Sequence, residues 1–403
     1  MCAREIIEPQ RRLPVADSAD VIVCGGGLGG VAAAVAAARN GANTLLVERQ
    51  RFLGGAAAAA TAGALAGFRD PAGPTGRQVV AGIAQELVQA LIEAGAAHLP
   101  GGKIEYAVGF RSEGLKYVLL RMCQEAGVRL RLDTWCCDAV VEGGCVTHVI
   151  VQSRAGRQAL AAIMTVDATR DGDVAASAGV PCEMVAEHDD DGMTLMYRLA
   201  GIDVRGFERR EGESAAARAD DSPAHGRAER VDELGNSRAS ARIAARASLE
   251  ELRRRRERSI GGPGEEREAL AARRWRRIRA QHTLSEEDAA RGRRFEDVVA
   301  VSPSPDSGDD SEAAEAREPG FDVPYRALLP LKVEGLLLAD GCISAEGRAR
   351  SATDLEAPDL ALSQAAGTAA ALCAALDVQP RELDVRLLQR TLVEQQAELL
   401  GRP

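Results

Sequence analysis

The stretch Val21-Ile-Val-Cys-Gly-Gly-Gly-Leu-Gly-Gly30 decides the fold of this chain of 403 residues. Its apolar start predicts a buried strand. The alanine-rich segment 28–39, which ends at Asn40-Gly41, predicts a helix with a C-terminal cap. A second apolar run over 44–48 predicts the next strand, which completes a β-α-β unit.

Three glycines of this stretch, Gly25, Gly27 and Gly30, satisfy the GxGxxG fingerprint of dinucleotide-binding proteins. The first permits a tight turn, the second lets a diphosphate approach the backbone, and the third allows close packing of helix on strand. Free N–H groups at the helix start attract the anion. Glu48 follows the second strand, close to the ~20-residue spacing expected for an acid that binds a ribose hydroxyl. The complete unit indicates a dinucleotide site more strongly than a lone glycine-rich turn.

Composition and charge exclude several other classes of protein. The net charge of −10 and the aromatic content of 3 % argue against a nucleic-acid partner, which needs basic and stacking surfaces. We expect no membrane span, because no run approaches ~20 apolar residues. Nine cysteines without a CxxC motif are typical of reduced thiols in a cytoplasm, and neither cysteine nor histidine spacing predicts a metal site.

Changes of texture along the chain predict five parts. These are a tail (1–18), a first dinucleotide-binding part (19–185), a substrate or cap domain (186–300) with low complexity over 205–264, an acidic linker (301–320), and a second dinucleotide-binding part (321–403). The expected helices are 78–94, 112–126, 242–252, 266–281 and 359–376, and the expected strands are 128–135, 139–141, 146–152, 161–166 and 335–339.

An ordered series of motifs resembles the FAD-dependent oxidoreductases of the glutathione-reductase-like fold, in the branch similar to the large subunit of heterodisulfide reductase. The resemblance covers most of the chain outside about 205–264. It implies an α/β fold with a Rossmann-like FAD-binding domain and an inserted α+β cap domain. The motifs are Val47-Glu-Arg49, Phe52-Leu-Gly-Gly55, 75–84, 114–119, Asp167-Ala-Thr-Arg-Asp-Gly-Asp173, 276–278, 292–295, 323–326, Gly341-Cys-Ile-Ser-Ala345 and Gln364-Ala-Ala-Gly-Thr-Ala369.

The fingerprint and the resemblance together nominate residues that bind FAD. We expect a helix to begin at Gln364, with its dipole facing the flavin; tight helix packing is an equal alternative for its small residues. Cys136 is expected near the adenine, and a redox pair with Cys137 is the weaker alternative. The nominated residues are Gly25, Gly27, Leu28, Gly29, Gly30, Glu48, Arg49, Gly54, Gly55, Cys136, Ala168, Thr169, Asp171, Asp340, Gly341, Ala365, Ala366, Gly367 and Thr368.

A second group of residues is nominated for catalysis. By resemblance, the segment around 276–282 covers the flavin, so its arginines are expected to bind a substrate carboxylate while a histidine or tyrosine moves a proton. The alternative for the arginines is a helix surface paired with glutamates. The catalytic candidates are Arg276, Arg277, His282, Tyr325 and Arg326.

Several positions depart from the pattern of that family. Arg170 replaces a glycine, Asp340-Gly341 replaces Gly-Arg, Asp354 replaces an arginine, and Ala280 replaces a glycine. We expect a left-handed backbone at Arg170, costing about 1–2 kcal/mol, and a side chain that crowds the cofactor while neighbouring aspartates compete for its charge. Replacing it by glycine is therefore expected to tighten FAD binding.

The leading functional hypothesis is oxidation of a small organic substrate by hydride transfer to flavin N5, with electrons passed to an acceptor that we do not identify. The departures favour an alternative, a degenerate flavin-binding or apo scaffold without turnover. A third possibility, an NAD-linked dehydrogenase, is weakened because such a fold does not need the C-terminal motifs.

Overall fold

The computed structural model describes residues 11–59, 63–70, 76–97, 99, 102–186, 274–305 and 319–400. Its centre is a sheet in the order β5-β2-β1-β8-β7-β6, with β13 beside the end of β8. The strands β1, β2, β5, β8 and β13 run parallel, so their carboxyl ends meet at one edge. Their bounds are β1 (Val15–Cys24), β2 (Thr44–Val47), β5 (Arg129–Arg131), β6 (Trp135–Glu142), β7 (Cys145–Ser153), β8 (Gly156–Asp167) and β13 (Leu336–Leu338). The expected α/β, Rossmann-like class is confirmed.

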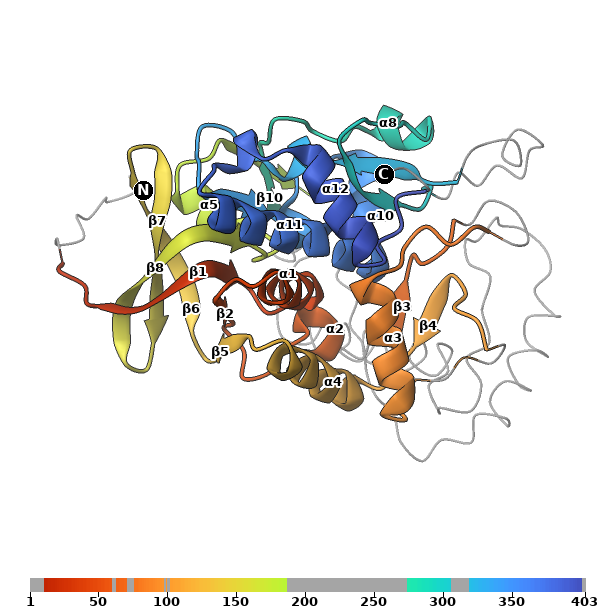
Figure 1. Ribbon diagram of the computed structural model, residues 1–403, viewed down its shortest axis with the longest axis horizontal. Helices are drawn as coiled ribbons and strands as arrows, with labels where there is room; N and C mark the ends of the chain where they lie inside the picture. Colours follow the sequence, from red (N-terminus) through yellow and green to blue (C-terminus); the bar gives the residue numbers. More distant parts are fainter. Residues whose placement is uncertain are drawn as a thin grey trace, which may run out of the picture.

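Two helices from opposite ends of the chain lie side by side against this sheet, α1 (Leu28–Arg39) and α11 (Glu356–Leu376) (Figure 1). Their backbones approach closely at Gly367, where a Cβ would overlap the carbonyl oxygen of Ala33. Among the described helices, α11 alone has the length and hydropathy of a membrane span, but most of it is buried inside the protein as a core helix.

The predicted β1-α1-β2 unit is confirmed, and α4 (Ser112–Glu125) also lies where expected. The helix expected over 78–94 begins later, as α3 (Ile83–Glu93), because Gly82 has a φ of +63° and Val79 bonds to Phe68. The strand expected over 128–135 is confirmed only in part, as β5, and ends early. Asp133, with a φ of +53°, separates β5, which pairs with β2, from β6, which starts an antiparallel meander.

The remaining described elements lie around the sheet edge. The helix expected over 266–281 is wrong for its described part, because β10 (Arg274–Ile278) pairs with β9 (Cys182–Ala186) and this tertiary pairing overrides the local spacing. The regions 205–264, with the helix 242–252, and most of the acidic linker lie outside the described residues. The other elements are α2 (Gly55–Ala59), β3 (Ala64–Ala66), β4 (Ala107–Gly109), α5 (Asp173–Ser177), α8 (Glu286–Ala290), β11 (Val298–Ser302), β12 (Phe321–Pro324), η1 (Tyr325–Leu328), η2 (Asp340–Cys342), α10 (Gly347–Thr353), η3 (Pro380–Glu382) and α12 (Val385–Glu394).

Candidate functional site

The amino end of α1 meets the carboxyl end of β1 in a turn that only glycine fits. Gly25 has a φ of +103°, and a Cβ there would overlap the carbonyl oxygen of Ala168. A Cβ on Gly30 would overlap the carbonyl oxygen of Gly25. The first and third fingerprint glycines therefore hold the helix close to β1 and β8.

The first turn of α1 is free to receive an anion. Its N-cap, Gly27, makes no side-chain capping bond, so the N–H groups of Leu28 and Gly29 are left without an intrahelical partner. A Cβ on Gly27 would have one neighbour within 4 Å, the Oδ2 atom of Asp340 at 2.9 Å. Gly54 N donates to the carbonyl of Gly26 at 2.8 Å, which places the Gly54-Gly55 pair beside this turn.

Glu48 follows β2 and lies beside the fingerprint. Its carboxylate is 6 % exposed and accepts hydrogen bonds from Gly26 N at 2.5 Å and from Gln50 N at 2.6 Å. Arg49 is exposed, with its guanidinium 5.8 Å from the centre of the Trp135 ring. These residues form the end of the site farthest from β13.

The two vicinal cysteines do not form a pair. Cys136 is buried and hydrogen-bonded to Cys24, which raises the pKa of Cys24, whereas Cys137 is exposed. Neighbours on a strand point to opposite faces, so the redox interpretation has no structural support.

The carboxyl end of β8 turns through a network centred on Asp167. Its carboxylate is buried and accepts bonds from Thr169 N, Thr169 Oγ1 and Ala175 N. Burial raises the pKa of Asp167, although these bonds oppose the shift. Ala168 N donates to the carbonyl of Cys24 at 2.8 Å, which joins this turn to the fingerprint. Asp171, in the same turn, is half-buried.

Arg170 adopts the expected left-handed backbone, with a φ of +62°. Its side chain, however, does not bind the adjacent aspartates as expected. It forms an ion pair with Asp354 at 2.6 Å, whereas Asp173 binds Arg276 at 2.5 Å. A Cβ on Gly341 would lie 2.7 Å from Asp354 Oδ1 and 3.2 Å from Arg170 Cγ. The Arg170 side chain therefore fills the space into which a side chain at 341 would grow.

Asp340 also has a left-handed backbone, with a φ of +54°, and is 8 % exposed. Its Oδ1 atom accepts a bond from Gly341 N at 2.5 Å. Burial raises the pKa of Asp340 to about 6, against the opposing charge of Arg170. Behind it, burial and the Asp340 charge raise the pKa of Asp359, whose Oδ1 accepts from Ser363 Oγ.

The chain matches the family described as FAD dependent oxidoreductase over residues 20–268 and 267–392. It belongs to this family. A comparison with curated proteins gives no significant match. FAD is thus the dinucleotide of the site, and the uncapped, glycine-lined turn at α1 has the form that its diphosphate requires.

Solved structures similar to this FAD oxidoreductase include THI4 from Thermovibrio ammonificans, at 19 % identity, with 42 % of this chain and 67 % of that chain covered and a TM-score of 0.31. The anhydrotetracycline hydroxylase OxyS from Streptomyces rimosus has 16 % identity, with 42 % and 35 % covered and a TM-score of 0.30. A 3-ketosteroid-delta4-(5alpha)-dehydrogenase from Rhodococcus jostii RHA1 has 16 % identity, with 88 % and 97 % covered and a TM-score of 0.40. This chain spans about a third of OxyS, and none of these likenesses assigns a substrate.

The small residues of α11 lie away from a helix end. The prediction that a helix begins at Gln364 is wrong, because α11 starts at Glu356 and residues 365–368 lie in its interior. Their N–H groups serve intrahelical bonds, so no dipole end faces the flavin from Ala365, Ala366 or Gly367. Their tight packing against α1 confirms the alternative interpretation, and Thr368 Oγ1 donates to the side chain of Gln395.

The catalytic candidates divide into two groups. Arg276 binds Asp173 and Arg277 binds Glu346 at 3.1 Å, so β10 brings both arginines to the strand edge that carries the fingerprint. His282, Tyr325 and Arg326 lie elsewhere.

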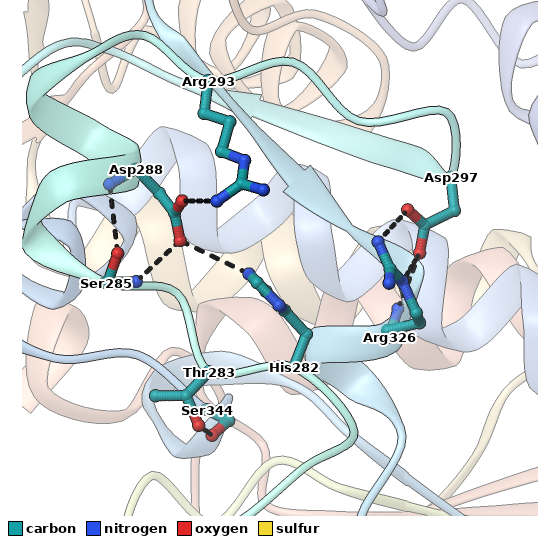
Figure 2. Close-up of polar contacts among 8 residues, drawn as sticks. All are labelled: His282, Thr283, Ser285, Asp288, Arg293, Asp297, Arg326 and Ser344. Carbon is teal, nitrogen blue, oxygen red and sulfur yellow. Dashed lines mark hydrogen bonds and ion pairs between the residues drawn. The ribbon is translucent and has the colours of Figure 1, made fainter.

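In Figure 2, His282 faces Asp288 at 3.4 Å and Arg326 faces Asp297. Tyr325 is buried and donates to the carbonyl of Pro380 at 2.9 Å. Tyr325 and Arg326 line an open cavity of about 570 Å³ with Arg381. Arg381 binds Glu334, just before β13, so this cavity lies at the opposite end of that strand from Asp340.

The site contains residues that we did not nominate from the sequence. Asp354, at the end of α10, lies beside Gly341, and Asp359 and Ser363 of α11 lie beside Gly29 in the first turn of α1. Arg350 donates to the carbonyl of Gly341 at 2.6 Å. The signal for two of them was a polar pair at four-residue spacing in an otherwise apolar helix. In the described part of the chain, no three His, Cys, Asp or Glu side chains gather as metal ligands.

Proposed function

We propose that this FAD oxidoreductase oxidises a small, carboxylate-bearing organic substrate. Bound FAD supplies a hydride acceptor at N5 and delivers the electrons to a second partner. The observation that carries the proposal is the position of Arg276. Its guanidinium contacts Asp173 and the carbonyl of Asp171, at the strand edge where the FAD diphosphate is expected.

The two arginines of β10 differ in what their surroundings allow. The Arg276 side chain is 36 % exposed, and a planar guanidinium binds carboxylates through two parallel hydrogen bonds. The Arg277 side chain is more buried, with Glu346 and Glu183 as ion-pair partners. We assign substrate binding to Arg276 and the positioning of β10 to Arg277.

A scaffold that binds flavin without turnover is the second candidate. Two observations favour it. The side chains of His282, Tyr325 and Arg326 bind other partners, away from the sheet edge that carries the glycine fingerprint. The Asp340 carboxylate faces the first turn of α1, where the diphosphate is expected. In this second case the glycine-lined turn and Glu48 would serve flavin binding alone.

Anaerobic reduction of the purified holoprotein separates the two functions. We expect flavin absorbance to bleach with small hydroxycarboxylates and to persist with the matching methyl esters. Arg276→Gln should raise KM with little change in kcat or flavin content, and Arg279→Gln, which removes a neighbouring arginine paired with Glu183, is the control. Bound flavin that no carboxylate reduces would favour the scaffold.

A further inference from the structure

The Asp340 carboxylate lies at the turn where the cofactor's diphosphate is expected. Its Oδ2 atom lies at the N-cap of α1, 2.9 Å from the position of a Cβ on Gly27. The amino end of a helix attracts negative charge, and in the free chain this carboxylate is the anion that it attracts. A bound diphosphate brings further negative charge to the same pole.

The charges of Arg170 and Arg350 favour the ionised form of Asp340, but each arginine also has another partner. Arg170 is committed to Asp354, and Arg350 donates to the Gly341 carbonyl. Within the described residues, the Asp340 carboxylate accepts one hydrogen bond, at Oδ1 from Gly341 N.

The other ionisable groups that face Asp340 add negative charge or none. Asp359 of α11 and Asp354 at the end of α10 raise the potential energy of a second anion, and the buried Cys342 thiol stays neutral because burial raises its pKa. Burial therefore favours the neutral form of Asp340, and the negative charge of a bound phosphate adds to this effect, whereas Arg170 and Arg350 oppose it.

We infer that Asp340 is a cofactor-binding residue that acts in its protonated form and donates a hydrogen bond from Oδ2 to a phosphate oxygen of FAD. One proton is taken from solvent on binding and forms an O–H bond on Oδ2, and no other covalent bond changes. A neutral acid both removes the repulsion and supplies a donor, as a carboxyl group kept protonated in an apolar site does elsewhere. The inference concerns the cofactor and stands apart from the proposed substrate.

Titration of FAD into the flavin-free full chain at several pH values tests this role. Free Asp340 ionises above about pH 6, so wild-type affinity should fall above that pH, by up to about tenfold per unit. Asp340→Asn keeps a donor and tolerates the left-handed backbone, so its affinity should stay high and flat with pH. Asp340→Gly should also be flat but weaker than Asp340→Asn, because it lacks the donor. Asp377→Asn, at the end of α11, removes a remote charge and should behave as wild type.

Calorimetry of the same titrations in two buffers of different ionisation enthalpy counts the proton. Wild type should take up close to one proton well above pH 6, and Asp340→Asn none. A wild-type affinity that does not change between about pH 6 and about pH 8, or an Asp340→Asn variant with the wild-type slope, overturns the inference. Failure of wild type to bind FAD at any pH overturns the cofactor assignment with it, which is a distinguishable result.

Discussion

The guanidinium of Arg170 meets the carboxylate of Asp354 at 2.6 Å, beside the bare backbone of Gly341. From the resemblance, all three were expected to depart from the family pattern, and in the structure they lie together. The Arg170 side chain extends from the turn after β8 into the space beside Gly341, where it forms the ion pair with Asp354. Arg170 and Asp354 therefore satisfy each other's charge in this fold, and the absence of a side chain at Gly341 leaves room for their contact.

The first prediction concerns the charge of Arg170. Arg170→Gly relieves the left-handed backbone, but it removes the positive charge that interacts with Asp340, Asp354 and Asp359. FAD affinity below about pH 6 should therefore fall roughly two- to fivefold, the effect of a half-exposed ion pair. Arg170 lowers the pKa of Asp340, so its loss raises that pKa and moves the fall in affinity to higher pH. Flavin titration across pH measures both effects.

The double variant Arg170→Gly with Asp354→Asn is the matched control, because it removes both partners and should recover most of the affinity. Tighter binding by Arg170→Gly at every pH would instead restore the expectation from sequence that this side chain crowds the cofactor.

The second prediction concerns Gly27. Its φ of −64° suits any residue, and the one close neighbour of the added Cβ is the Asp340 carboxylate, a side chain that must shift slightly. Gly27→Ala should therefore lower the melting temperature only a little. The new methyl group would occupy the path of the diphosphate and should weaken FAD binding by roughly 5- to 150-fold, the effect of about 1–3 kcal/mol of overpacking. Gly109→Ala, which meets a single atom at 3.5 Å, is the control. Normal flavin retention in Gly27→Ala would show that the diphosphate does not bind at this turn.

The third prediction concerns Glu48. Glu48→Gln keeps an acceptor for one backbone N–H but loses the charge that a ribose hydroxyl would bind. We expect a loss of about 1–2 kcal/mol in FAD affinity, or roughly 5- to 30-fold in Kd, by fluorescence titration. An unchanged Kd would place the ribose elsewhere.

The fourth prediction separates Tyr325 from catalysis. Burial raises the pKa of its hydroxyl, which donates to Pro380 and stays neutral. Tyr325→Phe should cost about 0.5–1.5 kcal/mol in the free energy of unfolding and leave the pH profile of turnover unchanged. A shifted pH profile would indicate that Tyr325 takes part in the reaction.

The fifth prediction sets sterics against helix propensity at Gly367. Alanine in a helix interior is favoured by about 1 kcal/mol over glycine, yet the added Cβ would overlap the Ala33 backbone. We expect Gly367→Ala to lower the melting temperature, whereas Ala375→Gly, at an exposed site of the same helix, should cost only the propensity difference. A higher melting temperature for Gly367→Ala would show that α1 and α11 can move apart at little cost in free energy.

Local signals made the β1-α1-β2 unit predictable, because its glycines and its periodicity act within about 30 residues. The strand β10 was not predictable in this way, because its partner, β9, lies about 90 residues earlier. The start of α11 was available from Pro358, since proline suits the first turn of a helix. The proximity of Asp340, Asp354 and Asp359 could not be predicted from the sequence, because three separate elements bring these residues together.

The contact of α1 with the C-terminal part of the chain also has a consequence for synthesis. Asn40 accepts a hydrogen bond from Gln395, 355 positions later, and Ile83 donates to Gln364, 281 positions later. At about 5–20 residues per second, a ribosome needs roughly 20–70 s to cross the longer interval. During that time the apolar face of α1 has no α11 to cover it, so the nascent chain exposes the surface that later packs against α11. The yield of folded protein in a cell should therefore depend on chaperones that shield this face until the last helices emerge.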